Sequence, residues 1–268
     1  MIATIIINTK NQNEFLERAL KSCLKQNFFN YEIIIADLTK KKNYIIRKKY
    51  KQNFKIKFID IKEKFLYPTQ NQLHAIKLAL KYSLGDDIYL LDGDDYFFKE
   101  KVNYISKIIK KKNFIMDLPL IFNEKNKKIV RKMKINYLKK KYWYNFLINK
   151  WPSISCTSAI CIKKKKLNEF FIQTDPFRWK YLAIDIQLAI YTTLEDSIYY
   201  INKDLTYKSQ NSNNLDKNYS NFLSKNYWLR RNEQHDFYLT LKKENNFLGF
   251  DYYITKIISF FIKIIVKS

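Results

Sequence analysis

Apolar runs and helical segments alternate along the first 91 residues of the chain. Continuous apolar runs rich in β-branched side chains occupy residues 3–8 and 31–37. Runs of this kind are typical of strands buried on both faces of a sheet. Between them, residues 13–26 place apolar side chains at helical spacing. Strand, helix and strand within 37 residues predict a mostly parallel sheet covered by helices on both faces.

The same alternation continues through two more expected strands. A helix over about 40–51 precedes a strand over 54–61, and the next apolar run lies at 88–91. Thr69 and Gln72 match a capping box, in which the two side chains satisfy free N–H groups at the start of a helix. We therefore expect a helix beginning at Thr69 ahead of the fourth strand.

Polar side chains follow three of these expected strands directly. They lie at residues 8–11, at Asp37 and at residues 92–95. Ligands of open parallel sheets bind outside the carboxyl ends of the strands. The three polar clusters, separated by dozens of residues in the chain, should therefore converge on one crevice.

The pattern beyond residue 115 is less regular. The Lys-rich residues 124–142 indicate a solvated hairpin or a surface helix, and residues 210–219 a polar loop or lid. The remaining expected elements are a strand over 153–162, a helix over 181–194, one or two strands over 197–209, and two final helices over about 220–245 and 250–267.

Composition limits the class of protein without choosing its function. With 268 residues, 47% of them apolar, the chain can bury a large core and is not a disordered protein. Its formal charge of +25 would attract nucleic acid, anionic lipid or phosphorylated substrates, although a composition bias toward lysine explains it equally well. The three cysteines form no CxxC pattern, so we expect neither a zinc site nor disulfides, and a cytoplasmic location.

The sequence IYLLDGDD, residues 88–95, ends an expected buried strand in three carboxylates. Mg²⁺ and Mn²⁺ prefer oxygen ligands and usually take one or two carboxylates together with substrate phosphates. Asp92 and Asp94 could supply them, while Gly93 lets a diphosphate approach the backbone closely. The alternative is a tight turn in which the aspartates, Asp95 among them, cap the following segment.

Three stretches of the chain together resemble the inverting family 2 glycosyltransferases. Residues 2–39 resemble the opening strand, helix and strand of that family, and TQNQLHAIKLALKYSLGDDIYLLDGDDYF its central helix, strand and DxDD signature. The stretch that begins DIQLAIYTTL at Asp185 resembles its late catalytic segment. The resemblance covers about residues 2–214 and says nothing about the sugar.

This resemblance implies a GT-A fold, an α/β architecture with a Rossmann-like, mostly parallel central sheet flanked by helices. It also implies a nucleotide-diphosphate sugar donor, most simply a UDP-sugar, and Mn²⁺ or Mg²⁺ as cofactor. Matched position by position, the donor nucleotide would contact Thr9, Asn11, Asp37, Asn71 and Asp92; the metal would bind Asp94 and Asp92; and Asp185 would be the catalytic base. Lys208 and Gln210 stand where the family usually has Arg and His, so the family's metal contact from that loop does not carry over.

Asp185 suits the role of a base on chemical grounds as well. Inverting transfer needs a carboxylate that accepts the proton of the attacking hydroxyl, and Asp185 begins an otherwise apolar helix. A structural helix cap is the alternative, with Asp175 as the second candidate base. On the acceptor side, Trp151, Arg178 and Trp179 are candidate contacts.

The C-terminal tail, FDYYITKIISFFIKIIVKS, places three lysines on one narrow helix face: Lys256, Lys263 and Lys267. Such a helix suits the headgroup layer of an anionic membrane, with its lysines toward the phosphates. Packing onto the catalytic domain, or onto a second copy in a homodimer, is the alternative. We expect a catalytic domain over 1–215 and a helical extension over 216–268, in a cytoplasmic protein that is peripheral on the inner face of the membrane.

These patterns predict a metal-dependent inverting glycosyltransferase. It would add one sugar to a glycan or lipid-linked glycan of capsule, lipooligosaccharide or another cell-surface polysaccharide. Two rivals fit parts of the sequence. A nucleic-acid-binding protein would explain the charge of +25 without the DxD, although we expect no nucleic-acid partner. A degenerate family member would bind a nucleotide sugar without transferring it.

Overall fold

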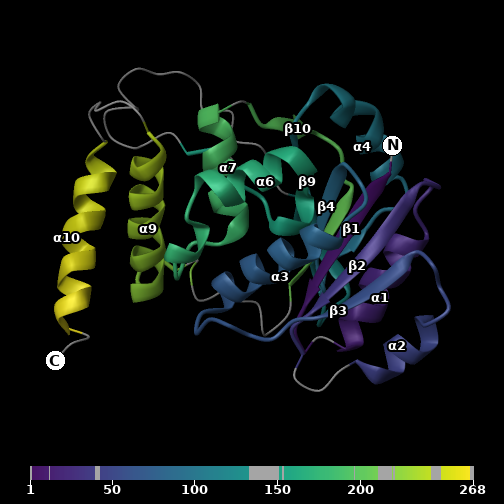
Figure 1. Cartoon of the computed structure of the whole chain (residues 1–268). Helices are drawn as coiled ribbons and strands as arrows, with labels where there is room; N and C mark the ends of the chain where they lie inside the picture. The colour runs from purple at the N-terminus through teal and green to yellow at the C-terminus, as the bar shows by residue number, and fades with distance from the viewer. Residues whose placement is uncertain are drawn as a thin grey trace.

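The computed structural model describes residues 2–11, 13–39, 43–132, 151–152, 154–195, 197–210, 219, 221–242 and 249–265. Strands and helices alternate through its first half (Figure 1). The strands are β1 (Ala3–Thr9), β2 (Tyr31–Asp37), β3 (Ile56–Asp60), β4 (Asp87–Asp92), β5 (Tyr96–Phe97), β6 (Phe114–Asp117), β7 (Leu120–Asn123), β8 (Lys128–Lys132), β9 (Ile160–Lys163), β10 (Tyr199–Ile201) and β11 (Thr206–Gln210). The helices are α1 (Asn13–Leu24), α2 (Tyr44–Tyr50), α3 (Pro68–Tyr82), α4 (Lys101–Ile108), α6 (Lys164–Gln173), α7 (Ile184–Glu195), α9 (Lys225–Leu241) and α10 (Phe250–Ile265), with short 3₁₀ turns η1 (Ile109–Lys111), η2 (Thr157–Ala159) and η3 (Pro176–Arg178).

A seven-stranded sheet in the order β10-β6-β9-β4-β1-β2-β3 forms the centre of the molecule. β1 pairs in parallel with β2 and β4, β2 with β3, and β10 with β6, while β9 alone in this sheet runs antiparallel to its neighbours β4 and β6. A smaller sheet, β5-β11-β7-β8, lies beyond the end of β4. The mostly parallel central sheet expected from the sequence is confirmed.

The core consists of two layers, one on each face of the central sheet. Successive side chains of a strand point to opposite faces, so Ile6 and Ile34 pack with α3, α6 and α7, while Ile5 and Ile33 pack with α1 and α4. All four isoleucines are fully buried. The continuous apolar runs of β1 and β2 are therefore explained by burial of both faces.

The capping box expected at the start of α3 is wrong. The helix begins at Pro68, and its N-cap, Tyr67, makes no side-chain cap hydrogen bond. Thr69 Oγ1 instead donates to the carbonyl of Lys180 at 2.5 Å, and Gln72 Nε2 donates to Asp92 Oδ1 at 2.8 Å. Both side chains are used for tertiary contacts, so the local motif does not form.

Two expectations for the second half need adjustment. The strand expected over 153–162 is confined to β9, because Thr157–Ala159 form a 3₁₀ turn. Within the Lys-rich stretch, β8 pairs antiparallel with β7 as a hairpin, whereas residues 133–142 lie outside the described part. The loop expected over 210–219 also lies almost entirely outside it.

Gly85 is required by close packing between the α3–β4 connection and β1. A Cβ at Gly85 would lie 2.6 Å from the carbonyl oxygen of Ile2 and 2.7 Å from the backbone nitrogen of Thr4. These are backbone atoms of the central sheet and cannot move aside as a flexible side chain would. Gly85→Ala should therefore lower the free energy of unfolding by about 2–3 kcal/mol, measured by urea denaturation. Leu84→Ala, at a neighbouring side chain that is 75% exposed, is the control and should change it by less than about 0.5 kcal/mol.

The two C-terminal helices expected from the sequence are confirmed as α9 and α10. α9 packs against the α/β body: Phe237 is buried in the same core cluster as Trp179, and Glu233 accepts hydrogen bonds from the backbone N–H groups of residues 180–182. α10 packs on the far side of α9, at the edge of the molecule (Figure 1). Among the described helices, none is both long and apolar enough to cross a membrane.

Candidate functional site

The carboxyl ends of three strands meet at one edge of the central sheet, as the sequence predicts. In the backbone register, Thr9 of β1 pairs with Asp37 of β2, and Asn8 pairs with Asp92 of β4. Past the strand ends, the N–H of Gly93 donates to the carbonyl of Asn8 at 2.8 Å. The expected convergence of the three polar clusters is confirmed.

The aspartates after β4 are held in different ways. Asp92 accepts a hydrogen bond from Gln72, and its own N–H donates to Ser158 Oγ at 3.0 Å. Asp95 accepts from the Ser158 hydroxyl at 2.6 Å and from the Ser209 N–H at 2.8 Å. Asp95 thus joins β4 to η2 and β11, instead of capping the segment that follows it.

Asp94 is anchored through its backbone. Its carbonyl oxygen accepts hydrogen bonds from Arg18 Nη2 at 2.8 Å and from Ser209 Oγ at 2.5 Å. Arg18 also pairs with Glu124 at 2.7 Å. Burial alone would raise the pKa of Glu124. The hydrogen bonds from Arg18 and Ser209 outweigh burial and lower that pKa to about 2. The position of the Asp94 backbone is therefore fixed by Arg18 and Ser209.

Negative charge is concentrated at this edge of the sheet. Burial, together with repulsion from Asp95, Asp94 and Asp185, raises the pKa of Asp92 well above its usual value. Burial and the Asp94 charge raise the pKa of Asp95 to about 7. Lys208 of β11 lies close enough to act in the opposite direction on both carboxyls. Burial and the neighbouring carboxylates together therefore outweigh the effect of Lys208 on Asp92 and Asp95.

Asp185 belongs to this charge cluster although 90 residues separate it from Asp95. It lies in the first turn of α7, half-buried, where its Oδ1 accepts from the N–H of Ile186 at 2.9 Å. The segment leading to it is held by Glu233 of α9, whose Oε2 accepts from the N–H of Leu182 at 3.0 Å. α9 therefore helps to position the start of α7 beside the sheet edge.

The donor-side residues expected from the resemblance differ in their surroundings. Thr9 is buried, and its hydroxyl makes no hydrogen bond to any residue that the structure describes. Asn11 is exposed, adopts a left-handed φ of 54° and donates its N–H to Thr39. Asp37 is buried and accepts from Asn43 and Arg47. Thr9, Asn11 and Asp37 thus lie at the ends of β1 and β2.

Asn71 is used within the fold. Its Oδ1 accepts from the N–H groups of Lys64 and Phe65, and its Nδ2 donates to the carbonyl of Phe65 at 2.7 Å. These bonds fix the loop between β3 and α3. Asn71 thus shapes the edge of the site by holding this loop.

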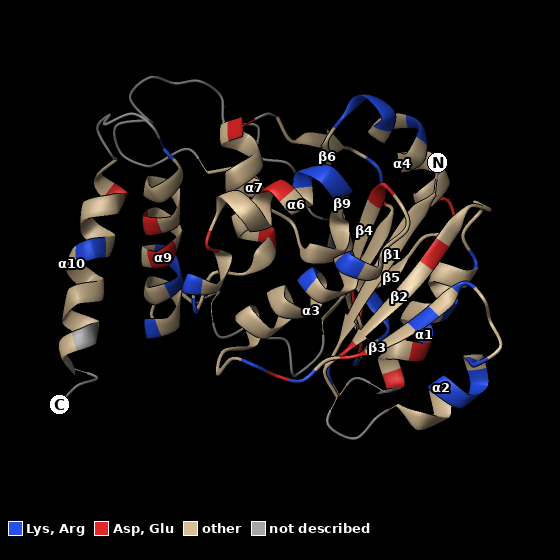
Figure 2. Cartoon of the chain, viewed as in Figure 1, with Lys and Arg blue, Asp and Glu red and all other residues tan. Residues whose placement is uncertain are grey.

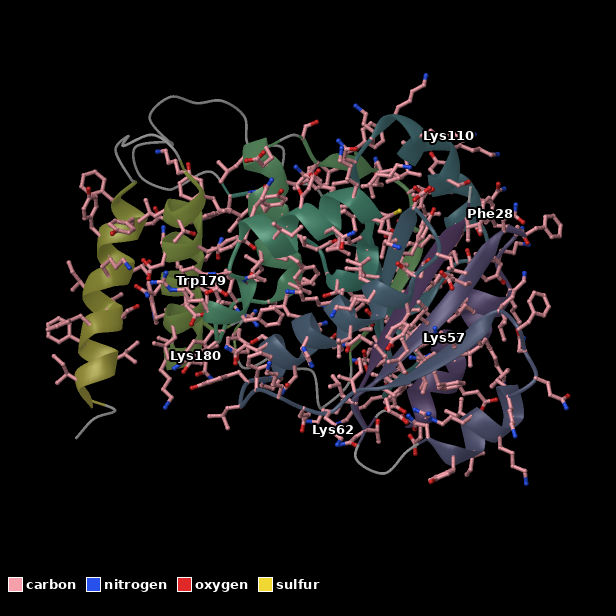
Figure 3. All side chains as sticks on the ribbon, in the orientation of Figure 1. Phe28, Lys57, Lys62, Lys110, Trp179 and Lys180 are labelled. Atoms are coloured by element: carbon pink, nitrogen blue, oxygen red, sulfur yellow. The ribbon has the colours of Figure 1, made fainter. Side chains whose placement is uncertain are left out.

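The acceptor candidates lie near α9. Trp179 is 5% exposed with its ring 5.7 Å from that of Phe237, and Figure 3 shows it beside α9. The ring of Trp151 is 5.0 Å from that of His235. Arg178 is exposed in η3, with its guanidinium 5.2 Å from the Trp179 ring. Packing explains both tryptophans, and the acceptor role of the three residues stays a prediction.

Sequence reasoning missed several residues that build the site: Arg18, Gln72, Glu124, Ser158 and Ser209. Each forms its contact with a residue at least 20 positions away in the chain. No local signal marks the two serines, and the spacing of Gln72 from Thr69 matches a capping box instead of a contact with Asp92.

The donor set at the sheet edge fits a hard divalent cation. In the part of the chain that the structure describes, no three or more His, Cys, Asp or Glu side chains are arranged to hold a metal ion by themselves. Mg²⁺ and Mn²⁺ sites of the expected kind use one or two carboxylates and complete their coordination with substrate phosphates. Asp94 and Asp92 can supply such oxygens, and a cation would relieve the repulsion that raises the pKa of Asp92.

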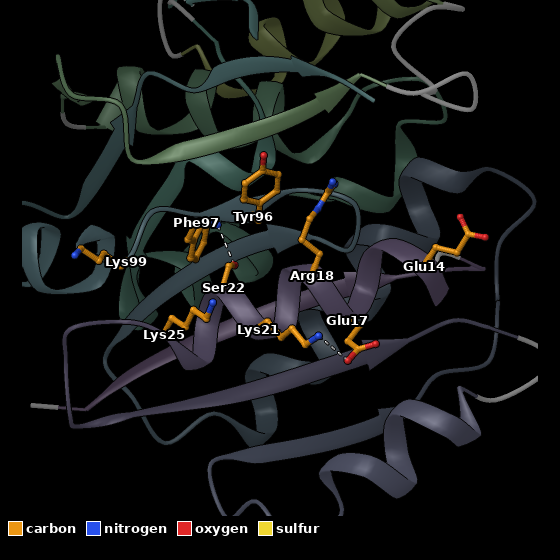
Figure 4. A pocket seen from close by; sticks show the side chains of 9 residues that line it. All are labelled: Glu14, Glu17, Arg18, Lys21, Ser22, Lys25, Tyr96, Phe97 and Lys99. Carbon is orange, nitrogen blue, oxygen red and sulfur yellow. Dashed lines mark hydrogen bonds and ion pairs between the residues drawn. The ribbon is translucent and has the colours of Figure 1, made fainter. Parts of the chain in front are cut away.

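A separate groove of about 500 Å³ lies between α1 and β5 (Figure 4). It is lined by Glu14, Glu17, Arg18, Lys21, Ser22, Lys25, Tyr96, Phe97 and Lys99. None of the aspartates placed at the sheet edge (Asp37, Asp92, Asp94, Asp95 and Asp185) lines it. Arg18 connects it to the site, through its contact with the carbonyl of Asp94.

Comparison with known proteins identifies the family. The sequence matches the family described as Glycosyl transferase family 2 over residues 4–171, and it matches no curated protein. The fold is similar to TarS 1-349 from S. aureus in complex with UDP, with a TM-score of 0.62 and 16% identity over 91% of this chain and 67% of that chain. The fold is also similar to the same fragment in complex with UDP-GlcNAc. The TM-score is 0.61, with 16% identity over 91% of this chain and 68% of that chain.

A third solved structure agrees. The mannosyltransferase PcManGT from Pyrobaculum calidifontis, in complex with GDP-Man and Mn²⁺, has a TM-score of 0.60 and 11% identity over 96% of this chain and 69% of that chain. The family match covers more than half of the chain and includes β4 and the aspartates after it. The chain therefore belongs to glycosyl transferase family 2 and is a glycosyltransferase of GT-A fold.

Proposed function

We propose that the chain transfers one sugar, with inversion and with the help of a divalent cation, from a nucleotide-diphosphate sugar to a hydroxyl group of a glycan. The observation that carries this proposal is the meeting of Asp185 with Asp92 and its neighbours at the carboxyl edge of the sheet. A site that combines a candidate base with a candidate cation site contains both groups that this reaction needs.

Asp185 acts as the base in this proposal. Its carboxylate accepts the proton of the acceptor hydroxyl while that oxygen forms a bond to the anomeric carbon of the donor. The bond between the anomeric carbon and the diphosphate breaks, and the nucleoside diphosphate leaves with the bonding electron pair. Attack from the face opposite the diphosphate inverts the anomeric configuration. The proximity of Asp185 to Asp92 supports this arrangement.

Asp94 and Asp92 would hold the cation, Mn²⁺ or Mg²⁺. When bound, such a cation neutralises the charge that develops on the departing diphosphate. Lys208 supplies a second positive charge to the same region, consistent with its influence on Asp92 and Asp95. The Arg18 and Ser209 hydrogen bonds keep the Asp94 backbone in place before the donor arrives.

The proposed donor is a UDP-sugar. Two of the similar solved structures hold UDP and UDP-GlcNAc, while the third holds GDP-Man with Mn²⁺. We assign the nucleotide to the ends of β1 and β2, at Thr9, Asn11 and Asp37. The buried Thr9 hydroxyl, which has no hydrogen-bond partner among the described residues, suits a contact with the donor.

The proposed acceptor is a glycan of capsule, lipooligosaccharide or another cell-surface polysaccharide. Residues 176–182 lead directly from η3 to the candidate base in α7. Arg178 is exposed in this segment, so it is the acceptor candidate best placed to contact a sugar hydroxyl.

A thermal-shift screen of nucleoside diphosphate sugars with and without Mn²⁺ tests this function. A donor at 100 times its Kd adds about 2.7 kcal/mol to the free energy of unfolding. This should raise the Tm of a chain of this size by roughly 5–10 °C. We expect this shift from a UDP-sugar only when Mn²⁺ is present. No metal-dependent stabilisation by any donor would contradict the proposal. Stabilisation without release of UDP in the presence of candidate acceptors would indicate a protein that binds the donor without transferring it.

A further inference from the structure

The inner face of α10 is polar. Asp251 Oδ2 accepts from Arg231 Nη2 of α9 at 2.7 Å, Lys256 forms an ion pair with Asp236, and Ser259 Oγ donates to the carbonyl of Trp228 at 3.3 Å. Asp251 and Ser259 are buried, as is Thr255 between them. Lys256, which the sequence predicts to face lipid phosphates, instead faces α9. Polar contacts thus fix how α10 is turned about its own axis.

The outer face of α10 is apolar. Seven large side chains on it are 46–62% exposed: Phe250, Tyr253, Ile254, Ile257, Phe260, Phe261 and Ile264. At about 200 Å² for a large side chain, this outer stripe presents roughly 700 Å² of accessible surface. That area exceeds the largest apolar patch of a typical monomer, about 300–600 Å². A surface helix normally turns its apolar side to the core. In α10 the apolar side faces outward, so we expect a binding partner to cover it.

The apolar surface continues at the C-terminal end of the outer stripe. Phe222 and Leu223, just before α9, are 64% and 78% exposed. The Trp228 indole N–H donates to the carbonyl of Phe222, and the carbonyl of Trp228 accepts from Ser259 of α10. These contacts place Phe222 and Leu223 beside the last turns of α10 and lengthen the exposed surface.

Charge decides between two occupants, a second copy of the chain and a lipid bilayer. The chain carries 50 basic against 25 acidic residues, a formal charge of +25. A second copy would carry the same positive charge, so the two chains would repel each other. A bilayer with anionic headgroups would instead attract the positively charged chain. Figure 2 shows α10 as a mostly uncharged helix at the molecular edge of a chain rich in Lys and Arg. The charge favours the anionic bilayer.

We propose that α10 lies in the headgroup layer of an anionic membrane, with the outer stripe at the acyl boundary and α9 between it and the catalytic body. Helices with Phe and Ile on one face and polar groups on the other bind membranes in this way. In Figure 3 the side chains of α10 project away from the body on the side opposite α9. The proposal does not rest on the transfer reaction, since it uses none of the site residues.

Flotation of the full chain with vesicles tests the proposal. We expect binding to vesicles of equal parts phosphatidylglycerol and phosphatidylcholine, and at least roughly tenfold weaker binding to phosphatidylcholine alone. The triple variant Ile257→Ser, Phe260→Ser, Phe261→Ser should lose at least about tenfold of the binding to the anionic vesicles. Phe54→Ser with Leu66→Ser, at side chains 93% and 87% exposed elsewhere, is the matched control and should bind like the unaltered chain.

Two further measurements keep the test decisive. All three native cysteines are buried, so Ile257→Cys can carry an environment-sensitive dye selectively, and its emission should shift to the blue with anionic vesicles while that of Phe54→Cys does not. Sedimentation velocity without lipid should give a monomer. A dimer that the triple variant dissociates, equal binding of the triple variant and the control, or no binding to anionic vesicles would each overturn the proposal.

Discussion

Asp185→Asn should lower kcat by roughly 10²–10⁴-fold while the donor still binds. The amide of Asn keeps the shape of the side chain and its place in the first turn of α7, but it cannot accept a proton from the acceptor hydroxyl. The substitution also removes one of the negative charges that raise the pKa of Asp92. Binding of the metal and the donor diphosphate should therefore be at least as tight as in the unaltered enzyme.

Release of UDP in the presence of acceptor measures kcat, and thermal shift with donor and Mn²⁺ measures binding separately. Asp175→Asn is the matched control, because Asp175 is the nearest preceding acid and lies exposed at the start of η3. Asp175→Asn should leave kcat and donor binding unchanged. Unaltered turnover in Asp185→Asn would remove Asp185 as the base, and a loss in Asp175→Asn alone would assign the role to Asp175.

The alternation of strands and helices along the first half of the chain, and the burial of the first two strands, could be predicted because they depend on local composition. The β-branched runs of β1 and β2 are long enough to fill both faces of a sheet. Since parallel strands align their carboxyl ends, the polar clusters beyond them had to meet, and the pairs Thr9–Asp37 and Asn8–Asp92 do so. The meeting point of the site thus followed from pattern and topology.

The division of roles among neighbouring polar residues could not be predicted in the same way. Gln72 satisfied the pattern of a capping box, yet its amide reaches Asp92 because α3 begins at Pro68 and passes the end of β4. From the sequence alone, Asp95 could equally have capped a turn. In the structure Ser158 and Ser209 donate hydrogen bonds to its two carboxylate oxygens. The role of each polar side chain therefore depends on which residues, distant in the chain, lie next to it in the folded protein.

The orientation of α10 is a further limit of sequence reasoning. Its pattern indicated an amphipathic helix with lysines outward, but the polar partners that turn it are on α9. Asp236 and Arg231 pair with Lys256 and Asp251, and these pairs place the polar face inward. Periodicity gives the two faces of a helix and leaves open which one the neighbour takes.

Asp94→Ala should abolish the Mn²⁺-dependent part of donor binding and lower kcat/KM by roughly 10²–10³-fold. The reason lies in how Asp94 is held. Arg18 and Ser209 bind its carbonyl oxygen, so removal of the carboxylate leaves the backbone anchored and the fold intact. The loss should therefore appear in metal affinity, with little change in the free energy of unfolding.

Titration of Mn²⁺ at fixed donor concentration, followed by thermal shift, separates the two effects. Asp86→Asn is the matched control, because Asp86 is an exposed acid next to the opposite end of β4, and it should bind Mn²⁺ and donor normally. If Asp94→Ala retained the full metal-dependent shift, the cation would not be held by Asp94. If both variants lost it equally, the effect would come from overall charge. A selective loss in Asp94→Ala would tie the negative cluster after β4 to the diphosphate, because only a cation there allows one anionic group to bind beside another.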